Sequence, residues 1–353
     1  MSDAIALTRS LRELGLDVER QEVEDGRPNV VGVLKGSGGS PSLMLNGHLD
    51  TSYSGTEPWL DGIPGFQPKG FVRDGRIFGR GVCDMKAGLA AMLLAARSVA
   101  KKLSGTPGVV LVLTAAEEGG CIGSQHLART QLLGKAGAIV VGEPTSNYPY
   151  VGHKGSLKFY ARFRGVSAHA SMPDLGVNAI YKAARAVARL EAFDFGQPAH
   201  PVMGMPTMNV GTFAGGEGVN MVPDSASVGV DIRTVPGMDH MALRTKLQAL
   251  LGDEAEIDVF SDMNAVWTEP EQDWVRRVFE IAGRTLGVKP EPRAQTYNTD
   301  AGNLLRVYKS APTVVLGPGE PQQAHQTDEW CSMERVRQSV GIYEALIRDW
   351  CGN

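Results

Sequence analysis

Cysteine is scarce in this chain, and its few cysteines are widely spaced. The 353 residues include four, namely Cys83, Cys121, Cys331 and Cys351. No two of them form a Cys-x-x-Cys pair, which disfavours zinc knuckles, thioredoxin-like redox motifs and a disulfide scaffold. We therefore expect reduced thiols and a cytoplasmic protein.

Long apolar runs and clusters of basic residues are also missing. No stretch approaches the roughly 18 apolar residues that a membrane-spanning helix needs. Lysine and arginine total 35 and aspartate and glutamate 39, a net charge of −4 without a basic run. Binding to a membrane or to nucleic acid is therefore not expected. A nucleotide-binding protein is disfavoured too, because no Gly-x-Gly-x-x-Gly or P-loop pattern follows an expected strand.

The length and the apolar pattern of the chain indicate two domains. Largely apolar segments are typical of strands covered on both faces of a largely parallel sheet, and they lie at 42–46, 109–116, 138–141 and 313–316. Helices are expected at 4–14, 87–103 and 334–350. Between 156 and 260 the pattern becomes strand, helix, strand, strand, helix, strand, which is the ferredoxin-like order.

The predicted fold class is therefore α/β, with an insertion. The main domain, residues 1–154 and 263–353, is expected to hold a largely parallel mixed sheet flanked by helices. The inserted domain, residues 155–262, is expected to be a smaller ferredoxin-like α+β domain.

Histidine and acidic residues follow the apolar strands. His48 follows the first strand, Glu117 and Glu118 end the second, and Glu143 follows the third. His325 comes nine residues after the fourth. Because ligands of open α/β sheets bind at the carboxyl ends of the strands, these side chains predict one polar pocket.

Each of these motifs alone has a simpler interpretation. The sequence His48-Leu49-Asp50 also fits a strand that ends in a capping aspartate, and Asp84 stands where the next helix needs an N-cap. Glu117 and Glu118 are the stronger signal, because adjacent carboxylates at the end of a buried strand repel each other unless cations neutralise them. A solvated loop would also tolerate the pair.

Five ordered motifs, which span nearly the whole chain, together resemble one family. They are Gly47-His48-Leu49-Asp50-Thr51, Gly79-Arg-Gly-Val-Cys-Asp84-Met-Lys86, Ala116-Glu117-Glu118-Gly119, Gly142-Glu143-Pro144-Thr145 and Gly317-Pro-Gly-Glu-Pro-Gln-Gln-Ala-His325. The chain resembles the co-catalytic zinc amidohydrolases and metallopeptidases. This family includes acetylornithine deacetylase, succinyl-diaminopimelate desuccinylase, carboxypeptidase G, aminoacylase and dipeptidases.

The resemblance implies two divalent metal ions, with Zn(II) favoured over Co(II) or Mn(II). One ion is expected to be held by His48, Glu143 and a bridging Asp84. The other is expected to be held by Asp84, Glu118 and His325. Glu117 is implied as the general base and Asp50 as the partner of His48. The Asp84–Met85 peptide resembles one that is cis in the family.

The resemblance also gives residues 155–262 the role of a lid and dimerisation domain. His169 resembles a lid histidine that stabilises the oxyanion, often from the partner subunit of a homodimer. Asn220 and Arg233 resemble residues that hold the substrate carboxylate, a task for which the planar arginine fork is suited. A salt bridge from Arg233 to Asp231 or Asp224 is the alternative.

Gly317 and Gly319 are expected to let the backbone approach the substrate closely. The expected substrate is a small N-acyl amino acid, deacylated as by acetylornithine deacetylase. A carboxypeptidase or dipeptidase acting on short peptides with the same site is the alternative. A non-catalytic binding protein is disfavoured, because all five ligand positions and Glu117 are present.

Overall fold

The computed structural model describes residues 2–36, 41–52, 70–100, 103, 106–130, 136–309 and 311–352. The chain divides into two compact units. Unit 1 comprises Met1–Gly152, Val266–Ala294 and Thr299–Asn353, and unit 2 comprises His153–Ala265 and Gln295–Asn298. The short segment Gln295–Asn298 joins unit 2 although no sequence pattern predicts it.

Unit 1 contains a six-stranded sheet in the order β1-β2-β6-β3-β7-β16. The strands are β1 (Asp17–Glu24), β2 (Arg27–Lys35), β6 (Gly108–Thr114), β3 (Ser42–His48), β7 (Ala136–Val141) and β16 (Thr313–Val315). Strands β6, β3, β7 and β16 are parallel, whereas β2 is antiparallel to both of its neighbours. The predicted largely parallel mixed sheet is confirmed.

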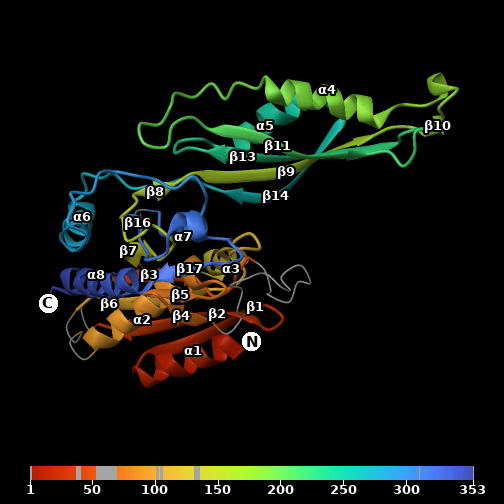
Figure 1. The fold of residues 1–353 in the computed structure, drawn as a ribbon. Helices are drawn as coiled ribbons and strands as arrows, with labels where there is room; N and C mark the ends of the chain where they lie inside the picture. Colours follow the sequence, from red (N-terminus) through yellow and green to blue (C-terminus); the bar gives the residue numbers. More distant parts are fainter. Residues whose placement is uncertain are drawn as a thin grey trace. The chain divides into compact units, whose positions relative to one another are not determined.

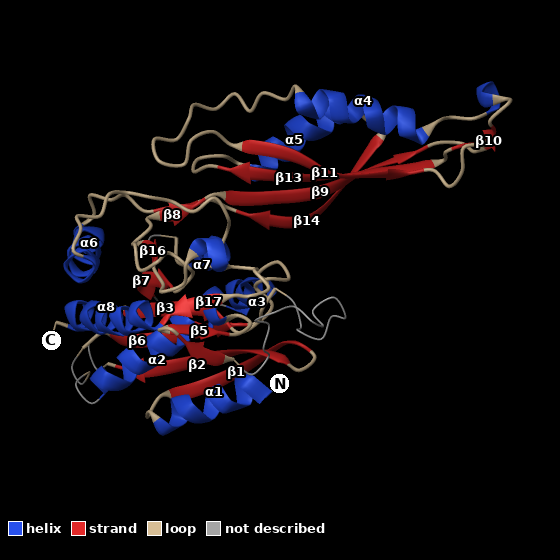
Figure 2. Ribbon diagram, viewed as in Figure 1, coloured by secondary structure: helices blue, strands red, loops and turns tan. Residues whose placement is uncertain are grey.

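Helices cover both faces of this sheet (Figure 1, Figure 2). One core includes residues of α1 (Ser2–Glu13), α2 (Ala87–Val99), α6 (Asp273–Leu286) and α8 (Met333–Cys351). A second core includes residues of α3 (Ile122–Thr130) and α7 (Ala301–Val307). Leu111 of β6 belongs to the first core, and its neighbours Val110 and Val112 belong to the second. Burial on both faces thus explains the uninterrupted apolar strands.

Two small sheets lie outside the six-stranded sheet. Strands β17 (Trp330–Ser332), β5 (Arg76–Phe78) and β4 (Phe71–Arg73) form an antiparallel sheet, and β15 (Val266–Trp267) pairs with β8 (Gly152–His153). Asp74 and Gly75 connect β4 to β5 with φ of 49° and 71°. Positive φ at both central residues is what a tight hairpin turn requires.

Unit 2 has an antiparallel sheet in the order β11-β13-β9-β14. Its elements follow the chain as β9 (Gly155–Arg164), α4 (Ala179–Glu191), β11 (Thr207–Gly215), β13 (Ser225–Thr234), α5 (His240–Leu251) and β14 (Ala255–Met263). This is the predicted ferredoxin-like order. Both helices pack on one face of the sheet and bury Leu157, Phe159 and Ala161. Buried and more exposed side chains therefore alternate along β9 from Leu157 onward.

Short elements lie outside these layers. In unit 2, β10 (Ala168–His169) pairs with β12 (Met221–Val222), and Pro173–Leu175 forms a 3-10 turn, as does Pro321–Gln323 in unit 1. In the described part of the chain, every helix is too short or too polar to cross a membrane.

Candidate metal centre

Three neighbouring parallel strands of unit 1 end in the polar residues that the sequence singled out. Strand β3 ends at His48, Glu117 and Glu118 follow β6, and Glu143 follows β7. Because β3 pairs with both β6 and β7, His48 is placed between the other two groups. The topology therefore brings these residues to one edge of the sheet.

Asp84 reaches this edge from the segment that precedes α2. Residues Val82–Lys86 form one irregular helical turn (η2), in which Asp84 and Met85 have non-helical dihedral angles. The Asp84–Met85 peptide is cis, as the resemblance implied. A Cβ atom on Gly88 would lie 2.4 Å from the carbonyl oxygen of Gly142, so only glycine lets α2 approach the end of β7 this closely.

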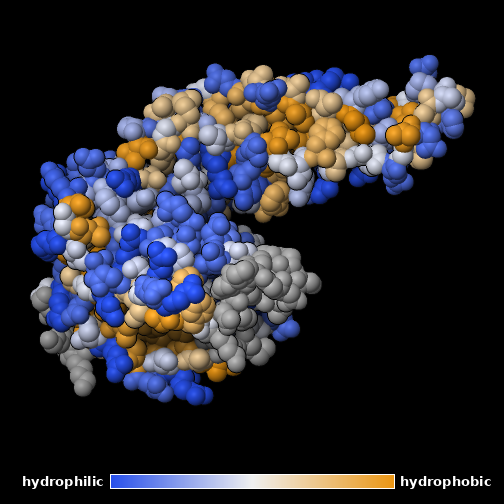
Figure 3. All heavy atoms as spheres, in the orientation of Figure 1, coloured by the Kyte–Doolittle hydropathy of each residue, from blue (hydrophilic) through white to orange (hydrophobic). Residues whose placement is uncertain are grey.

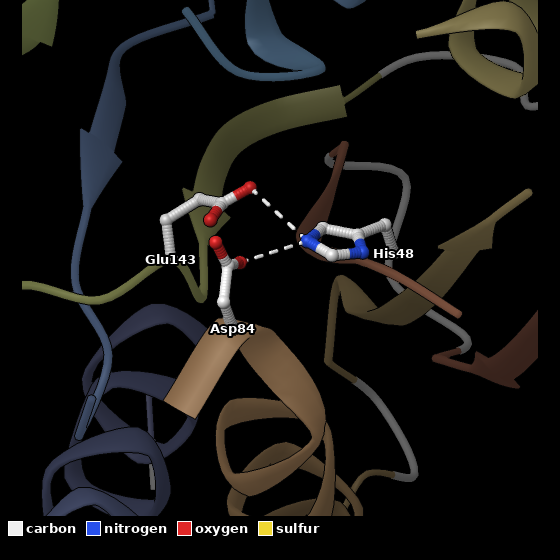
Figure 4. A group of neighbouring side chains, drawn as sticks. All are labelled: His48, Asp84 and Glu143. Atoms are coloured by element: carbon white, nitrogen blue, oxygen red, sulfur yellow. Dashed lines mark hydrogen bonds and ion pairs between the residues drawn. The ribbon is translucent and has the colours of Figure 1, made fainter. Parts of the chain in front are cut away.

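His48, Asp84 and Glu143 form a first cluster, in which both carboxylates face the imidazole (Figure 4). The Nε2 atom of His48 lies 3.0 Å from Oδ1 of Asp84 and 3.8 Å from Oε1 of Glu143. His48 and Glu143 are buried, and Asp84 is partly exposed.

Asp84, Glu118 and His325 form a second cluster. The Nε2 atom of His325 lies 3.0 Å from Oε2 of Glu118 and 3.5 Å from Oδ2 of Asp84. Asp84 therefore turns one carboxylate oxygen toward each histidine. Within each cluster the donor atoms lie within 4.8 Å of one another, a spacing that can surround a metal ion.

These clusters concentrate negative charge around two imidazoles. Burial would lower the pKa of His48, but Asp50, Asp84 and Glu143 together raise it well above its ordinary value. Hydrogen bonds to Asp84 and Glu118 raise the pKa of His325 to about 10. A site that attracts protons this strongly also attracts metal cations, because the same carboxylates stabilise both.

The donor atoms fit divalent metal ions. The Oε1 atom of Glu118 is buried and has no hydrogen-bond partner among the described residues, although its Oε2 atom faces His325. A buried carboxylate oxygen of this kind needs a partner, and a cation at the second cluster would supply one. Imidazole and carboxylate ligands suit Zn(II), and Co(II) or Mn(II) accept the same donors.

Glu117 belongs to neither cluster of potential ligands in the described part of the chain. Its Oε1 atom accepts a hydrogen bond from the Cys121 thiol, with 3.1 Å between the two atoms. Burial and the charges of Asp300 and Asp84 raise the pKa of Glu117 to about 8, although His48 acts in the opposite direction. A carboxylate with a raised pKa beside a metal centre is suited to accept a proton.

Asp50 contacts His48 differently from the expected carboxylate pairing. The Nδ1 atom of His48 lies 3.1 Å from the main-chain oxygen of Asp50, and the nearest carboxylate oxygen is 3.6 Å away. The carboxylate instead accepts the N–H groups of Glu117 at 3.0 Å and Glu118 at 3.1 Å. Asp50 thus orients the imidazole through its carbonyl and the two glutamates through its side chain.

Gly317 and Gly319 lie against the backbone that carries the clusters. A Cβ atom on Gly317 would lie 2.1 Å from the Gly142 oxygen, and one on Gly319 would lie 2.4 Å from the Cys83 oxygen. Close packing of three loops therefore accounts for both glycines. Their contact with a substrate stays a prediction.

The remaining predicted residues belong to unit 2, where His169 and Asn220 lie together. His169 pairs with Met221 across the β10–β12 ladder, and the main-chain oxygen of Asn220 accepts the N–H of Ala170 at 3.0 Å. The Nδ1 atom of His169 lies 2.7 Å from the Ser171 hydroxyl oxygen. The β10–β12 ladder forms one end of unit 2 (Figure 1).

Arg233 lies near the other end of β13. Its guanidinium group contacts the Asp231 carboxylate at 2.9 Å and the Asn298 side-chain oxygen at 3.3 Å. Eight residue steps along β13 separate Ser225 from Arg233, roughly 27 Å at the usual rise of a strand. Within one unit, Asn220 and Arg233 therefore lie far apart, and their role at the substrate carboxylate stays a prediction.

Three residues near the clusters were not predicted. Glu329 accepts backbone hydrogen bonds around Asp84, and Asp300, which is buried, accepts a hydrogen bond from Thr114. Cys121 contacts Glu117. Only Glu329 carried a sequence signal, because it follows His325 by four residues.

Comparisons with known proteins identify relatives of this chain. The profile of peptidase family M20/M25/M40 matches residues 44–349. The chain is 31% identical to an acetylornithine deacetylase of Myxococcus xanthus, over 97% of this chain and 90% of that protein. It is 28% identical to a probable succinyl-diaminopimelate desuccinylase of Staphylococcus epidermidis, over 96% of this chain and 90% of that protein.

A solved structure shares the fold. An M20 family metallo-carboxypeptidase from Sulfolobus solfataricus superimposes with a TM-score of 0.80 at 19% sequence identity. The match covers 98% of this chain and 93% of that chain.

Proposed function

Since the chain belongs to peptidase family M20/M25/M40 and is therefore a metal-dependent amide hydrolase, we propose that it deacylates a small N-acyl amino acid. The proposed ligands of two metal ions are His48, Asp84, Glu118, Glu143 and His325. One observation carries this assignment: the two oxygens of Asp84 face two different histidines, each beside a further glutamate.

The proposed chemistry assigns a separate task to each group. Bound metal ions, with zinc first and cobalt or manganese as substitutes, would supply Lewis acidity and water of lowered pKa. Glu117 accepts the proton of the attacking water and delivers it to the leaving nitrogen. Asp50 keeps His48 and Glu117 in place through the contacts described above. An acetylornithine deacetylase among the relatives supports a deacylase.

We propose that unit 2, close to residues 155–262, is a lid and dimerisation domain. Strand β11 lies at the edge of its sheet and is exposed along most of its length. Apolar side chains are visible along unit 2 in Figure 3, and the large exposed ones of this unit include Val166, Met172, Leu175, Tyr181, Phe213 and Val219. Exposed apolar side chains of this kind are available to an interface between subunits.

A homodimer would also explain why the predicted substrate-binding residues of unit 2 lie at its two ends. Arg233 is proposed to hold the substrate carboxylate in one subunit. His169 and Asn220, which lie at the other end of the unit, are proposed to serve the site of the partner, where His169 stabilises the oxyanion. Light scattering should give the mass of two chains, and a single-chain mass at working concentration would contradict this part.

A hydrolysis screen tests the proposed reaction. Purified protein is assayed against acetylated and succinylated amino acids and against dipeptides, with and without chelator. We expect turnover of acylated amino acids that is lost with chelator and restored by zinc or cobalt. Turnover of dipeptides alone would indicate a peptidase instead of a deacylase. Turnover that persists in the presence of chelator would contradict the metal-dependent mechanism. The proposed cytoplasmic location continues to rest on the sequence.

A further inference from the structure

The carboxylate of Glu329 is held within the backbone segment that carries Asp84. Its Oε2 atom accepts the N–H of Gly81 at 2.7 Å. Its Oε1 atom accepts the N–H of Cys83 at 2.6 Å and that of Asp84 at 2.9 Å. Glu329 is only 6% exposed, so these contacts are shielded from water.

The segment around Asp84 needs such an acceptor because its backbone is not a regular helix. Gly81 has left-handed dihedral angles, with φ of 70°, and Asp84 and Met85 are non-helical. Buried N–H groups without a helical partner require another acceptor. One carboxyl group accepts all three of them here.

Glu329 is itself fixed by neighbouring strands. Its main-chain oxygen accepts the N–H of Gly79 at 3.2 Å, and the next residue, Trp330, pairs with Phe78 in the β17–β5 ladder. Glu329 also lies four residues after His325. The segment 325–329 therefore carries a potential metal ligand at one end and the acceptor for the Asp84 loop at the other.

We propose that Glu329 is a positioning residue that fixes the backbone of Asp84 so that this carboxylate can bind both metal ions. The inference rests on the proposed two-metal function. Because Asp84 directs one oxygen to each cluster, a shift of its backbone changes both sites together. Glu329 touches neither the proposed metals nor the substrate and acts only through the loop.

The variant Glu329→Gln tests this role by metal affinity. An amide keeps one acceptor oxygen but turns its NH2 group toward at least one of the backbone N–H groups. We expect the affinity for both ions to fall about 10- to 100-fold, the usual effect of removing a residue that supports a metal ligand. Metal-free protein is titrated with zinc in competition with a chromophoric chelator.

Glu320→Gln is the matched control. Glu320 is another largely buried glutamate, but its side chain pairs with Arg335. Loss of that ion pair should lower the melting temperature and leave zinc affinity unchanged. A zinc affinity in Glu329→Gln equal to that of the wild type would overturn the proposal, as would an equal loss of affinity in both variants.

Glu329→Asp separates position from charge. Aspartate keeps the negative charge but is shorter by one methylene group, so a positioning role predicts weakened zinc binding in this variant too. Wild-type affinity in Glu329→Asp would show that charge alone matters and would contradict the proposal. If the wild-type protein itself binds fewer than two ions, the proposed function fails instead, which keeps the two failures distinct.

Hydrogen exchange in the metal-free wild-type protein gives a test that needs no variant. If Glu329 holds the loop, peptides covering residues 81–84 should stay protected from exchange without metal. Rapid exchange there, with protection retained in the neighbouring helix α2, would overturn the proposal.

Discussion

Two buried histidines, one in each unit, have opposite surroundings. His48 in unit 1 faces Asp84 and Glu143, and the carboxylates around it raise its pKa well above the ordinary value although burial opposes this. His153 in unit 2 has its Nδ1 atom 2.8 Å from the main-chain oxygen of Lys154. Burial lowers the pKa of His153 to about 4.

This contrast shows that burial does not by itself mark a functional histidine. A buried imidazole with only a backbone partner is stable as a neutral group, whereas one surrounded by carboxylates requires a cation. His240 in unit 2 has one hydroxyl and one carboxylate neighbour. It lies 2.8 Å from the Thr234 hydroxyl and 2.7 Å from the Asp262 carboxylate. Thr234 is fully buried, so this Thr-His-Asp arrangement cannot meet a substrate and is structural.

The largest expected effect comes from Glu117, at the carboxylate-rich edge of unit 1. Glu117→Gln keeps the shape of the side chain but cannot accept the proton of water. We expect kcat to fall about 10²- to 10⁴-fold with unchanged metal content. Glu334→Gln, at an exposed position of α8, serves as the control and should retain full activity. A kcat within a few-fold of the wild type would exclude Glu117 as the base.

The second test concerns His153 and the pH dependence of stability. The pKa of His153 is about 4 in the folded protein and 6.5 ordinarily, so the unfolded chain binds more protons between these values. The unfolding free energy should therefore fall as pH drops from 6.5 to about 4, by about 3 kcal/mol from this group, and then level off.

His153→Phe should remove this contribution. Denaturant unfolding of metal-free wild type and variant is compared at several pH values between 7 and 4. We expect the unfolding free energy of the wild type to fall by about 3 kcal/mol more than that of the variant as the pH drops from 7 to 4. A constant difference would mean that His153 is not a buried neutral imidazole.

Arg233 tests whether unit 2 contributes to substrate binding. Removing a hydrogen-bonding cation from a carboxylate should cost about 1.5–3 kcal/mol, or roughly 10- to 100-fold in KM. Arg233→Met should show this increase for acyl amino acids but not for their carboxamides. Arg162→Met removes a surface ion pair with Asp258 from the same sheet and should leave KM unchanged. Equal effects of Arg233→Met on acids and amides would argue against carboxylate recognition.

The smallest effect is expected at the start of α5. The Asp239 side chain accepts the N–H groups of Met241 at 2.8 Å and Ala242 at 3.3 Å, which makes it the N-cap. Asp239→Ala should destabilise unit 2 by about 1 kcal/mol without changing kcat, and Asp239→Asn should restore most of the stability. Denaturant unfolding measures both variants, and an unchanged midpoint in Asp239→Ala would contradict the cap.

The sequence could predict those parts of the molecule whose burial produces a regular pattern of apolar and polar residues. Strands β3, β6 and β7 are apolar because both faces are buried, and their ends place His48, Glu118 and Glu143 together. The alternating strands of unit 2 likewise predicted its ferredoxin-like order. Helices α3 and α7 were not predicted, because both are short.

Contacts made through the backbone left no such pattern. Asp50 meets His48 chiefly through a carbonyl oxygen, and Glu329 binds N–H groups whose positions depend on the folded shape of residues 81–84. The separation of Asn220 from Arg233 follows from the length of β13, which the motifs alone do not show. Sequence therefore indicates the ligands better than the residues that orient them.

Counting bound zinc in wild type and Asp84→Ala tests the central claim most directly. Metal-free protein is saturated with zinc, freed of excess, and analysed for metal per chain. The account predicts two tightly bound ions in the wild type and severely weakened binding of both in the variant. Two ions held by Asp84→Ala with wild-type affinity would contradict it.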